Sequence, residues 1–145
     1  MSEQNYLLYY MENTDMTNYI WLDHWCNKFG LLPIIIDRVS KAPKSLPNFK
    51  TVQEAIADDR FSNLEWVWLH PAAKMYLDEY NHPNDGIIYC IGSDFDGFDG
   101  MTVDELLGTT LKLRQPVERE GEWYASLVVP IVAYDRFLYL NGRRK

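Results

Sequence analysis

The sequence predicts an α/β fold in which a mainly parallel sheet is flanked by helices. Short apolar runs that fit buried strands alternate with segments of helical spacing, in the order β-α-β-α-β-α-β-α-β-α. Two of the runs, LLPIII at 31–36 and GIIYCI at 86–91, are apolar at almost every position. Such runs are typical of parallel strands that helices cover on both faces. Ligands of these folds bind beyond the carboxyl ends of the strands.

In the first half of the chain, the apolar run Tyr6–Tyr10 predicts the first strand. Apolar residues at helical spacing predict a helix over 17–29, which Gly30 ends as a left-handed C-terminal residue. The second strand follows directly. Prolines, serines and basic residues predict a loop over 38–50. Thr and Glu at the two ends of 51–54 fit a capping box that begins a short helix.

In the second half, further strands are predicted at 64–69, 86–91 and 110–113. Pro71 suits the first turn of a helix, and we expect this helix to run from 71 to about 79. A second capping box is predicted at 102–105. The long apolar segment 123–140 predicts a final helix, which Pro130 should kink because it removes one backbone hydrogen bond.

The composition limits the class of protein. At 145 residues, the chain fits one domain, residues 1–145, with a core that needs no disulfide or metal. Its 47% hydrophobic content argues against disorder, and its net charge of −7 argues against a surface that binds nucleic acid everywhere. Cys26 and Cys90 lie in apolar segments, so we expect buried free thiols. Without a visible leader or membrane-spanning run, we expect a soluble, cytoplasmic protein.

The acidic turn IGSDFDGF at 91–98 allows three interpretations. A calcium loop that starts at Asp94 would lack its fifth ligand, because Phe98 stands there, and its turn glycine, because Asp99 stands there. The stretch 94–97 also resembles the nucleophile motif of haloacid-dehalogenase-type phosphatases, although Phe98 replaces their Thr or Val. In the third interpretation, the turn is a backbone cradle for a cofactor, and we expect no metal there.

The third interpretation depends on motifs along the whole chain. Asn18, His24 and Gly30 match the spacing of an Asn, Arg and Gly motif on a first helix. CIGSDFDGF at 90–98 matches a strand that ends in Gly, then Ser or Pro, then Glu. A third motif is matched weakly between 111 and 135. With these motifs the chain resembles the SPOUT superfamily, specifically the minimal SpoU/TrmH-like RNA ribose 2'-O-methyltransferases.

The resemblance implies a C-terminal trefoil knot whose loops hold S-adenosylmethionine. It implies a homodimer in which both subunits contribute to each site, and the expected interface includes Trp21, Trp25, Trp123 and Phe137. The residues that would contact the cofactor lie at the ends of three strands and in the knot loop: Leu69, His70, Gly92, Ser93, Gly97, Phe98, Leu113, Gln115 and Ser126.

The resemblance also implies an RNA substrate, either tRNA or rRNA. Methyl transfer to a ribose requires removal of the 2'-hydroxyl proton, and a histidine with an unperturbed pKa of about 6.5 suits that task. The implied catalytic residues are His24, Asn18 and Asp94. The basic loop offers side chains for RNA phosphates: Arg38, Lys41, Lys44 and Lys50.

Three departures from the family pattern leave another hypothesis open. His24 replaces the family's Arg, Tyr124 replaces an Asn at the start of the last helix, and 113–115 replaces an Ile-Pro-Met stretch. The chain is therefore either a divergent enzyme or a SPOUT-fold module that binds RNA or a protein without catalysis. The phosphatase is the third hypothesis.

Overall fold

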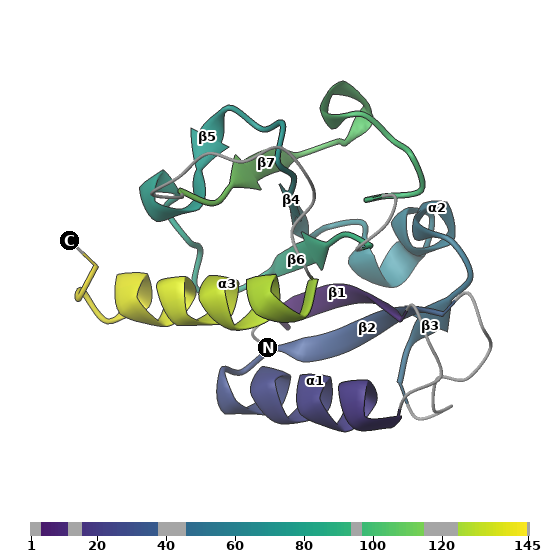
Figure 1. The fold of residues 1–145 in the computed structure, drawn as a ribbon, viewed down its shortest axis with the longest axis horizontal. Helices are drawn as coiled ribbons and strands as arrows, with labels where there is room; N and C mark the ends of the chain where they lie inside the picture. Colours follow the sequence, from purple (N-terminus) through teal and green to yellow (C-terminus); the bar gives the residue numbers. More distant parts are fainter. Residues whose placement is uncertain (1–3, 12–15, 38–45, 94–96, 115–124, 145) are drawn as a thin grey trace.

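The chain forms a single seven-stranded sheet in which every adjacent pair of strands is parallel. The computed structural model describes residues 4–11, 16–37, 46–93, 97–114 and 125–144. The strand order is β3-β2-β1-β6-β4-β7-β5 (Figure 1). The strands are β1 (Tyr6–Met11), β2 (Leu32–Asp37), β3 (Asn48–Phe49), β4 (Glu65–Leu69), β5 (Met75–Tyr76), β6 (Ile87–Ile91) and β7 (Thr109–Lys112). The predicted α/β fold class is confirmed.

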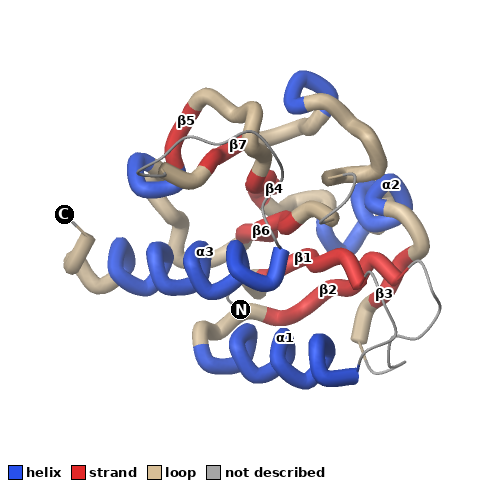
Figure 2. Tube along the Cα trace, in the orientation of Figure 1, coloured by secondary structure: helices blue, strands red, loops and turns tan. Residues whose placement is uncertain are grey.

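Helices cover both faces of the sheet, as the two-sided apolar strands require. The α-helices are α1 (Met16–Lys28), α2 (Val52–Ile56) and α3 (Ala125–Leu140), and the short 3₁₀ helices are η1 (Asp59–Phe61), η2 (Leu77–Glu79) and η3 (Val103–Glu105). α1 and α3 lie side by side on one face, and α2 lies on the other with η1 (Figures 1 and 2). All five residues of β6, near the middle of the sheet, are buried.

The core consists of two layers that the sheet separates. Leu22 of α1 and Val132 of α3 pack with one set of strand side chains, and Ala55 of α2 packs with the opposite set. Cys26 and Cys90 are buried and free, which confirms the expectation from the sequence. Burial raises the pKa of the Cys26 thiol to about 12, so this thiol is protonated and unreactive at neutral pH.

The predicted helix over 71–79 is wrong. This segment instead forms a turn, the two-residue strand β5 and the 3₁₀ helix η2. Met75 pairs with Leu111 and Tyr76 pairs with Lys112 of β7, so strand pairing at the edge of the sheet overrides the local helical preference. The Arg114 guanidinium carbon lies 3.9 Å from the centre of the Tyr76 ring and stabilises this arrangement.

The two predicted capping motifs, at 51–54 and 102–105, differ from each other in their hydrogen bonds. Thr51 Oγ1 accepts a hydrogen bond from the amide of Glu54, as predicted, but the Glu54 carboxylate accepts from the Lys50 amide and caps one residue earlier. Glu105 Oε1 accepts from both the amide and the hydroxyl of Thr102, as a capping box requires. The helix that follows Thr102 is only a short 3₁₀ turn.

The predicted final helix is confirmed as α3, which contains Pro130. α3 follows β7 in the chain but packs beside α1 and against β6, nearer the centre of the sheet. The ring of Phe137 on α3 meets that of Phe29 edge to face, with ring centres 6.2 Å apart. Within the described part of the chain, no helix combines the length and the apolar character that crossing a membrane requires.

Polar side chains of α3 and the segment around β6 form a group that we call the buried polar cluster. Its members are His82, Tyr89, Asp135, Arg136 and Arg144. The two ring nitrogens of His82 lie 2.6 Å from the Tyr89 hydroxyl and 2.7 Å from the Asp135 carboxylate. Burial lowers the pKa of His82, and the hydrogen bond to Asp135 opposes that shift only in part. His82 is therefore neutral at pH 7, donating to Asp135 and accepting from Tyr89.

The two arginines of the buried polar cluster bind backbone carbonyl groups. Arg136 donates to the carbonyl oxygens of Pro83 and Asn84 at 2.7 and 2.8 Å. Arg144 donates to Asp135 at 2.7 Å and to carbonyl oxygens at both ends of the segment 77–80. Burial alone would raise the pKa of Asp135, but the hydrogen bonds from His82 and Arg144 hold it below its ordinary value. The cluster fixes α3 to the segment between β5 and β6.

Candidate functional site

The carboxyl ends of β6, β4 and β7 meet at one edge of the sheet, because these strands are neighbours and run parallel. Leu69 at the end of β4 pairs with Ile91 on one side and Leu111 on the other. His70, Gly92 and Leu113, the residues just beyond these ends, therefore lie along the same edge. The structure thus brings together the predicted residues of the three strand ends.

His70 is held by backbone contacts at this edge. Its amide donates to the carbonyl oxygen of Leu111 at 2.8 Å, and its Nδ1 accepts from the amide of Ala72 at 3.0 Å. Burial lowers the pKa of His70, so its ring is neutral at pH 7. A neutral ring with Nδ1 occupied leaves Nε2–H as a donor beside the end of β4.

The turn after β6 closes on itself through its backbone. The Ser93 amide donates to the carbonyl oxygen of Gly97 at 2.8 Å, and the two residues form an antiparallel bridge. A Cβ at Gly92 would lie 3.1–3.2 Å from backbone atoms of Gly97, so Gly92 is required by the turn itself. The sequence predicted these glycines for approach to a ligand, and for Gly92 the structure gives an internal reason.

Gly97 differs from Gly92 because its open side faces outward. Its φ is +60°, in the left-handed region that favours glycine. A Cβ built there would meet no heavy atom within 4 Å. Gly97 is partly exposed and its carbonyl oxygen already accepts from the Ser93 amide, so what the structure offers here is space beside the residue, just beyond the end of β6, where ligands of such sheets bind.

Phe98 anchors the turn to the core. Its ring is 1% exposed and meets the Trp68 ring edge to face, with ring centres 4.9 Å apart. The Tyr10 ring also packs edge to face on Phe98, at 6.1 Å. Phe98 can therefore contribute only its backbone to the edge. Sequence reasoning missed Tyr10 as part of this arrangement, because the contact joins residues 88 positions apart.

The two predicted catalytic residues of the first helix lie six residues apart on α1. His24 is exposed on α1, and Asn18 belongs to the first part of the same helix, where only the backbone is described. Six residues in an α-helix correspond to about 9 Å along the axis and about 240° around it. His24 is exposed on α1, which packs on the same face of the sheet as α3.

Several predicted residues cannot be placed. Asp94, Gln115, Arg38, Lys41 and Lys44 lie outside the described residues, as do Trp123 and Tyr124. Ser126 lies in the first turn of α3, where its side chain is not described. Lys50 is described and exposed, and its Nζ donates to the carbonyl oxygen of Asp37 at 3.3 Å. Among the described residues, no three His, Cys, Asp or Glu side chains are arranged to hold a metal ion.

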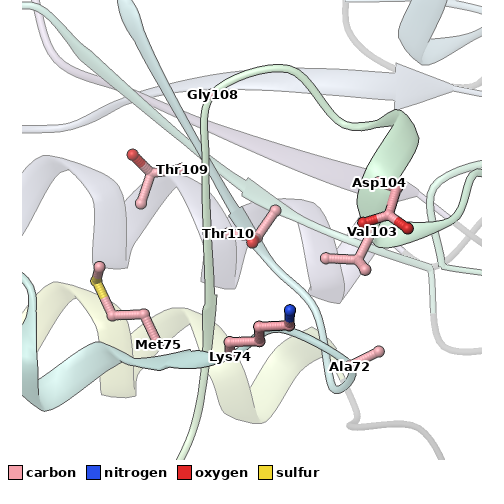
Figure 3. Close-up of a pocket in the computed structure, with 8 residues that line it drawn as sticks. All are labelled: Ala72, Lys74, Met75, Val103, Asp104, Gly108, Thr109 and Thr110. Carbon is pink, nitrogen blue, oxygen red and sulfur yellow. The ribbon is translucent and has the colours of Figure 1, made fainter.

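A hollow of about 400 Å³ lies between β5, β7 and η3 (Figure 3). Ala72 and Lys74 of the segment after β4 form one wall, and Thr110 of β7 forms another. Figure 3 shows Lys74, Thr110 and Asp104 bringing an amine, a hydroxyl and a carboxylate to this space. Sequence reasoning named none of its residues. The hollow provides room for a small polar group below the segment that follows His70.

The fold occurs in solved structures of RNA-modifying enzymes. One, studied for the 2-OH methylation of C/U34 on tRNA, has a TM-score of 0.71 at 15% identity, with 97% of this chain and 99% of that chain covered. The A. aeolicus TrmH/SpoU tRNA-modifying enzyme has a TM-score of 0.66 at 12% identity, covering 99% and 78%. The AdoMet-bound rRNA methyltransferase from Sinorhizobium meliloti has a TM-score of 0.66 at 11% identity, covering 97% and 58%.

These similarities extend over nearly the whole chain and confirm the predicted α/β fold with a parallel sheet, which the chain shares with solved TrmH/SpoU-type RNA-modifying enzymes. No family model matches the sequence, and no curated protein matches it either. The similarity is therefore visible in the arrangement of the strands and helices and not in the sequence as a whole.

Proposed function

We propose that the protein is an S-adenosylmethionine-dependent RNA ribose 2'-O-methyltransferase of the SpoU/TrmH type, with residues 1–145 as one catalytic domain. The observation that carries the proposal is the 92–98 turn at the end of β6. It lies beside the end of β4, in a fold shared over almost the whole chain with RNA methyltransferases. The RNA substrate is tRNA or rRNA.

The edge formed by β4, β6 and β7 suits S-adenosylmethionine. The absence of a side chain at Gly97, where a Cβ would meet no heavy atom within 4 Å, leaves room for an adenine or ribose edge to approach the turn. Leu113, which is partly buried, contributes apolar surface, and His70 contributes a donor, whereas Leu69 is buried in the core and can contribute only its backbone. When bound, the cofactor supplies a methyl group on an electrophilic sulfonium. Leu113, Gln115 and Ser126 belong to the two ends of the segment that completes the site.

A trefoil knot around the cofactor is part of this proposal. α3 follows β7, which is separated from β6 by β4, and yet α3 packs against β6 and α1. The chain therefore returns toward the centre of the sheet after β7, which supports a knotted path. The segment that would pass through the knot loop, 115–124, lies outside the described residues.

The active unit is a homodimer, and its interface includes α3. Four apolar side chains of this helix are 46–61% exposed: Leu127, Ile131, Tyr134 and Phe137. Leu127, Ile131 and Tyr134 recur at intervals of four and three residues, so they form one stripe. A continuous exposed apolar stripe is typical of a protein interface. Phe29 and Trp25, stacked on α1, extend it beside Phe137.

His24 is the general base and acts on the site of the second subunit. It is exposed on α1, which packs beside α3, so dimerisation through α3 can bring it to the site of the second subunit. His24 takes the proton of the 2'-hydroxyl, while Asn18 and Asp94 orient the ribose. Arg38, Lys41, Lys44 and Lys50 bind RNA phosphates.

Titration calorimetry with S-adenosylmethionine tests the proposal first. We expect binding in the micromolar range, and the absence of binding heat at millimolar cofactor would reject the enzyme. Transfer of a labelled methyl group to unfractionated tRNA and rRNA then tests catalysis. His24→Ala should abolish transfer and spare cofactor binding, whereas His24→Arg, which restores the residue of the family, should retain activity. Unchanged turnover in His24→Ala would exclude His24 as the base.

The dimer is tested separately by analytical ultracentrifugation. Ile131→Glu introduces a charge into the middle of the α3 stripe and should yield monomers. Leu107→Glu is the matched control, because Leu107 is 78% exposed but lies beside η3 and outside the stripe. A dimer that survives Ile131→Glu would exclude α3 from the interface.

A SPOUT-fold module that binds without catalysis remains a second candidate. The observation that favours it concerns Arg114, which lies in the stretch 113–115 where the chain departs from the family pattern. Its guanidinium donates to Asp78 at 2.9 and 3.4 Å, so this residue stabilises η2. Cofactor binding or dimerisation without methyl transfer to any RNA would favour this candidate. Hydrolysis of a phosphate ester that requires Asp94 would favour the phosphatase.

A further inference from the structure

Asp99, directly after the 92–98 turn, has an unusual backbone conformation. Its φ is +56°, and it is the one non-glycine residue with a positive φ among those that the structure describes. This conformation is unfavourable for an L-residue, although Asp and Asn tolerate it better than most. Such a residue persists only where its surroundings hold it in place.

One carboxylate oxygen of Asp99 connects three segments of the chain. Asp99 Oδ2 accepts a hydrogen bond from the Tyr10 hydroxyl and another from the Val52 amide, both at 3.2 Å. Tyr10 lies near the carboxyl end of β1, and Val52 is the first residue of α2. The oxygen therefore fixes the exit of the turn to two elements that are distant in sequence.

The turn is thus held at both of its ends. At its start, the Ser93 amide donates to the Gly97 carbonyl oxygen. At its exit, the Phe98 ring is buried on one side and the Asp99 carboxylate is bound on the other. Gly97 is part of the first contact and is followed directly by the residues of the second, Phe98 and Asp99. Its position therefore depends directly on the contacts of Asp99.

Val52, the α2 residue in this contact, is close in sequence to the basic loop 38–50 that we propose to bind RNA. Val52 follows Lys50 by two residues, and Lys50 is itself bound to the carbonyl oxygen of Asp37 at the end of β2. A shift of this segment on RNA binding would be transmitted to the turn through the Val52 amide and the Asp99 carboxylate.

We infer that Asp99 is a positioning residue, which holds the 92–98 turn in the geometry that binds S-adenosylmethionine and connects it to the basic loop through Val52. This inference rests on the proposed function, because the turn must be part of the cofactor site. It adds a residue that neither the sequence motifs nor the comparisons identify.

Three variants separate the effect of the Asp99 carboxylate from the effect of the Asp99 backbone conformation. Asp99→Gly removes the acceptor and also removes the strain of positive φ. Asp99→Asn keeps an acceptor oxygen and tolerates the same φ, so it is the conservative control. Tyr10→Phe removes one donor and keeps the ring that packs on Phe98.

Hydrogen exchange and calorimetry provide two independent readouts. In Asp99→Gly, we expect the Ser93 amide to exchange at least about tenfold faster while the β6 amides keep their protection, since only the turn opens. The dissociation constant of S-adenosylmethionine should rise about tenfold in Asp99→Gly, less in Tyr10→Phe, and no more than about twofold in Asp99→Asn.

The outcomes distinguish this inference from the proposed function. If Asp99→Gly exchanges at Ser93 as the wild type does, or binds the cofactor equally well, Asp99 does not position the turn. Equal acceleration at Ser93 and in β6 would mean that Asp99 stabilises the whole fold, which also rejects the inference. If the wild-type protein binds no S-adenosylmethionine, the proposed function fails, and faster exchange at Ser93 alone then still supports the role of Asp99 in holding the turn.

Discussion

The segments around β6 contain two regions of opposite chemical character. The buried polar cluster contains His82, Tyr89, Asp135 and two arginines, residue types that often occur in active sites. In this protein, however, these side chains form hydrogen bonds with one another and with backbone carbonyl groups. The turn after β6 presents glycine, serine and a buried phenylalanine, yet its backbone is open at Gly97. The residue types alone would favour the buried polar cluster over the turn that we propose as the cofactor site.

The difference lies in access to solvent and in satisfied hydrogen bonds. The His82 side chain is fully buried, and both of its ring nitrogens have partners inside the protein. A catalytic histidine needs a free nitrogen that a substrate can reach. In the turn, the contacts are made by backbone groups and by one buried ring, and the outward side remains available. The cluster therefore stabilises the fold, while the turn remains the binding surface that we propose.

Loss of an arginine from the cluster should have the largest effect on stability. Arg136→Met leaves two carbonyl oxygens and the Tyr89 hydroxyl without their donor. We expect the free energy of unfolding to fall by about 3 kcal/mol, the range for breaking a buried charged interaction. Urea denaturation measures this loss.

Arg143→Met is the control, because Arg143 is exposed and should change stability by no more than about 0.5 kcal/mol. Below the unfolding temperature, Arg136→Met should bind S-adenosylmethionine as the wild type does. A large loss of cofactor affinity with little loss of stability would contradict the assignment of the cluster to the fold.

Acid should destabilise the protein through His82, with a smaller effect than the loss of Arg136. Because burial lowers the pKa of His82 in the folded state, the unfolded chain takes up the proton first as the pH falls below about 6.5. The stability is present above that pH and decreases below it, by at most about 1.4 kcal/mol per pH unit.

Urea denaturation at pH 7.5, 6.5 and 5.5 checks this dependence. In His82→Gln, the free energy of unfolding should decrease less between pH 6.5 and pH 5.5 than it does in the wild type. His70→Gln is the comparison, since burial also lowers the pKa of His70 but this residue is less enclosed. An identical slope in His82→Gln and the wild type would show that His82 does not control the acid response.

A loss of stability smaller than that of Arg136→Met, and the most specific change in binding, are expected at the turn. Gly97→Ala and Gly100→Ala both place a side chain at positive φ, and neither new Cβ meets another heavy atom. Each should cost about 1–2 kcal/mol. Only Gly97→Ala should also weaken S-adenosylmethionine binding, by about tenfold, because its Cβ covers the open backbone. Equal cofactor binding by the two variants would exclude Gly97 from the site.

Local patterns in the sequence were sufficient to predict five of the seven strands, but β3 lies in the segment 38–50, which was predicted as a loop. The runs 31–36 and 86–91 are apolar on both faces, and this property is present only where helices cover a parallel strand on each side. The long apolar segment 123–140, which contains Pro130, was likewise sufficient to predict α3. The segment 71–79 was predicted incorrectly, because the pairing of Met75 with Leu111 depends on a strand 36 residues later in the chain.

The candidate site was only partly predictable. The strand ends could be located from the pattern, and the sheet then places Leu69, His70 and Gly92 at one edge. The contact of Asp99 with Tyr10 and Val52 could not be predicted, since it joins segments 89 and 47 residues apart. The buried polar cluster could not be predicted either, because nothing in the local sequence of His82 indicates that Asp135 is its partner.

The position of β6 in the sheet has a consequence for how the chain folds during synthesis. β6 lies between β1 and β4, which are both made earlier, so these two strands cannot complete the sheet by pairing with each other. Until residues 87–91 leave the ribosome, β1 and β4 each present an unpaired apolar edge, and such edges promote aggregation. Fragments that end before residue 87 should therefore aggregate, and the sheet can close only when β6 enters its centre.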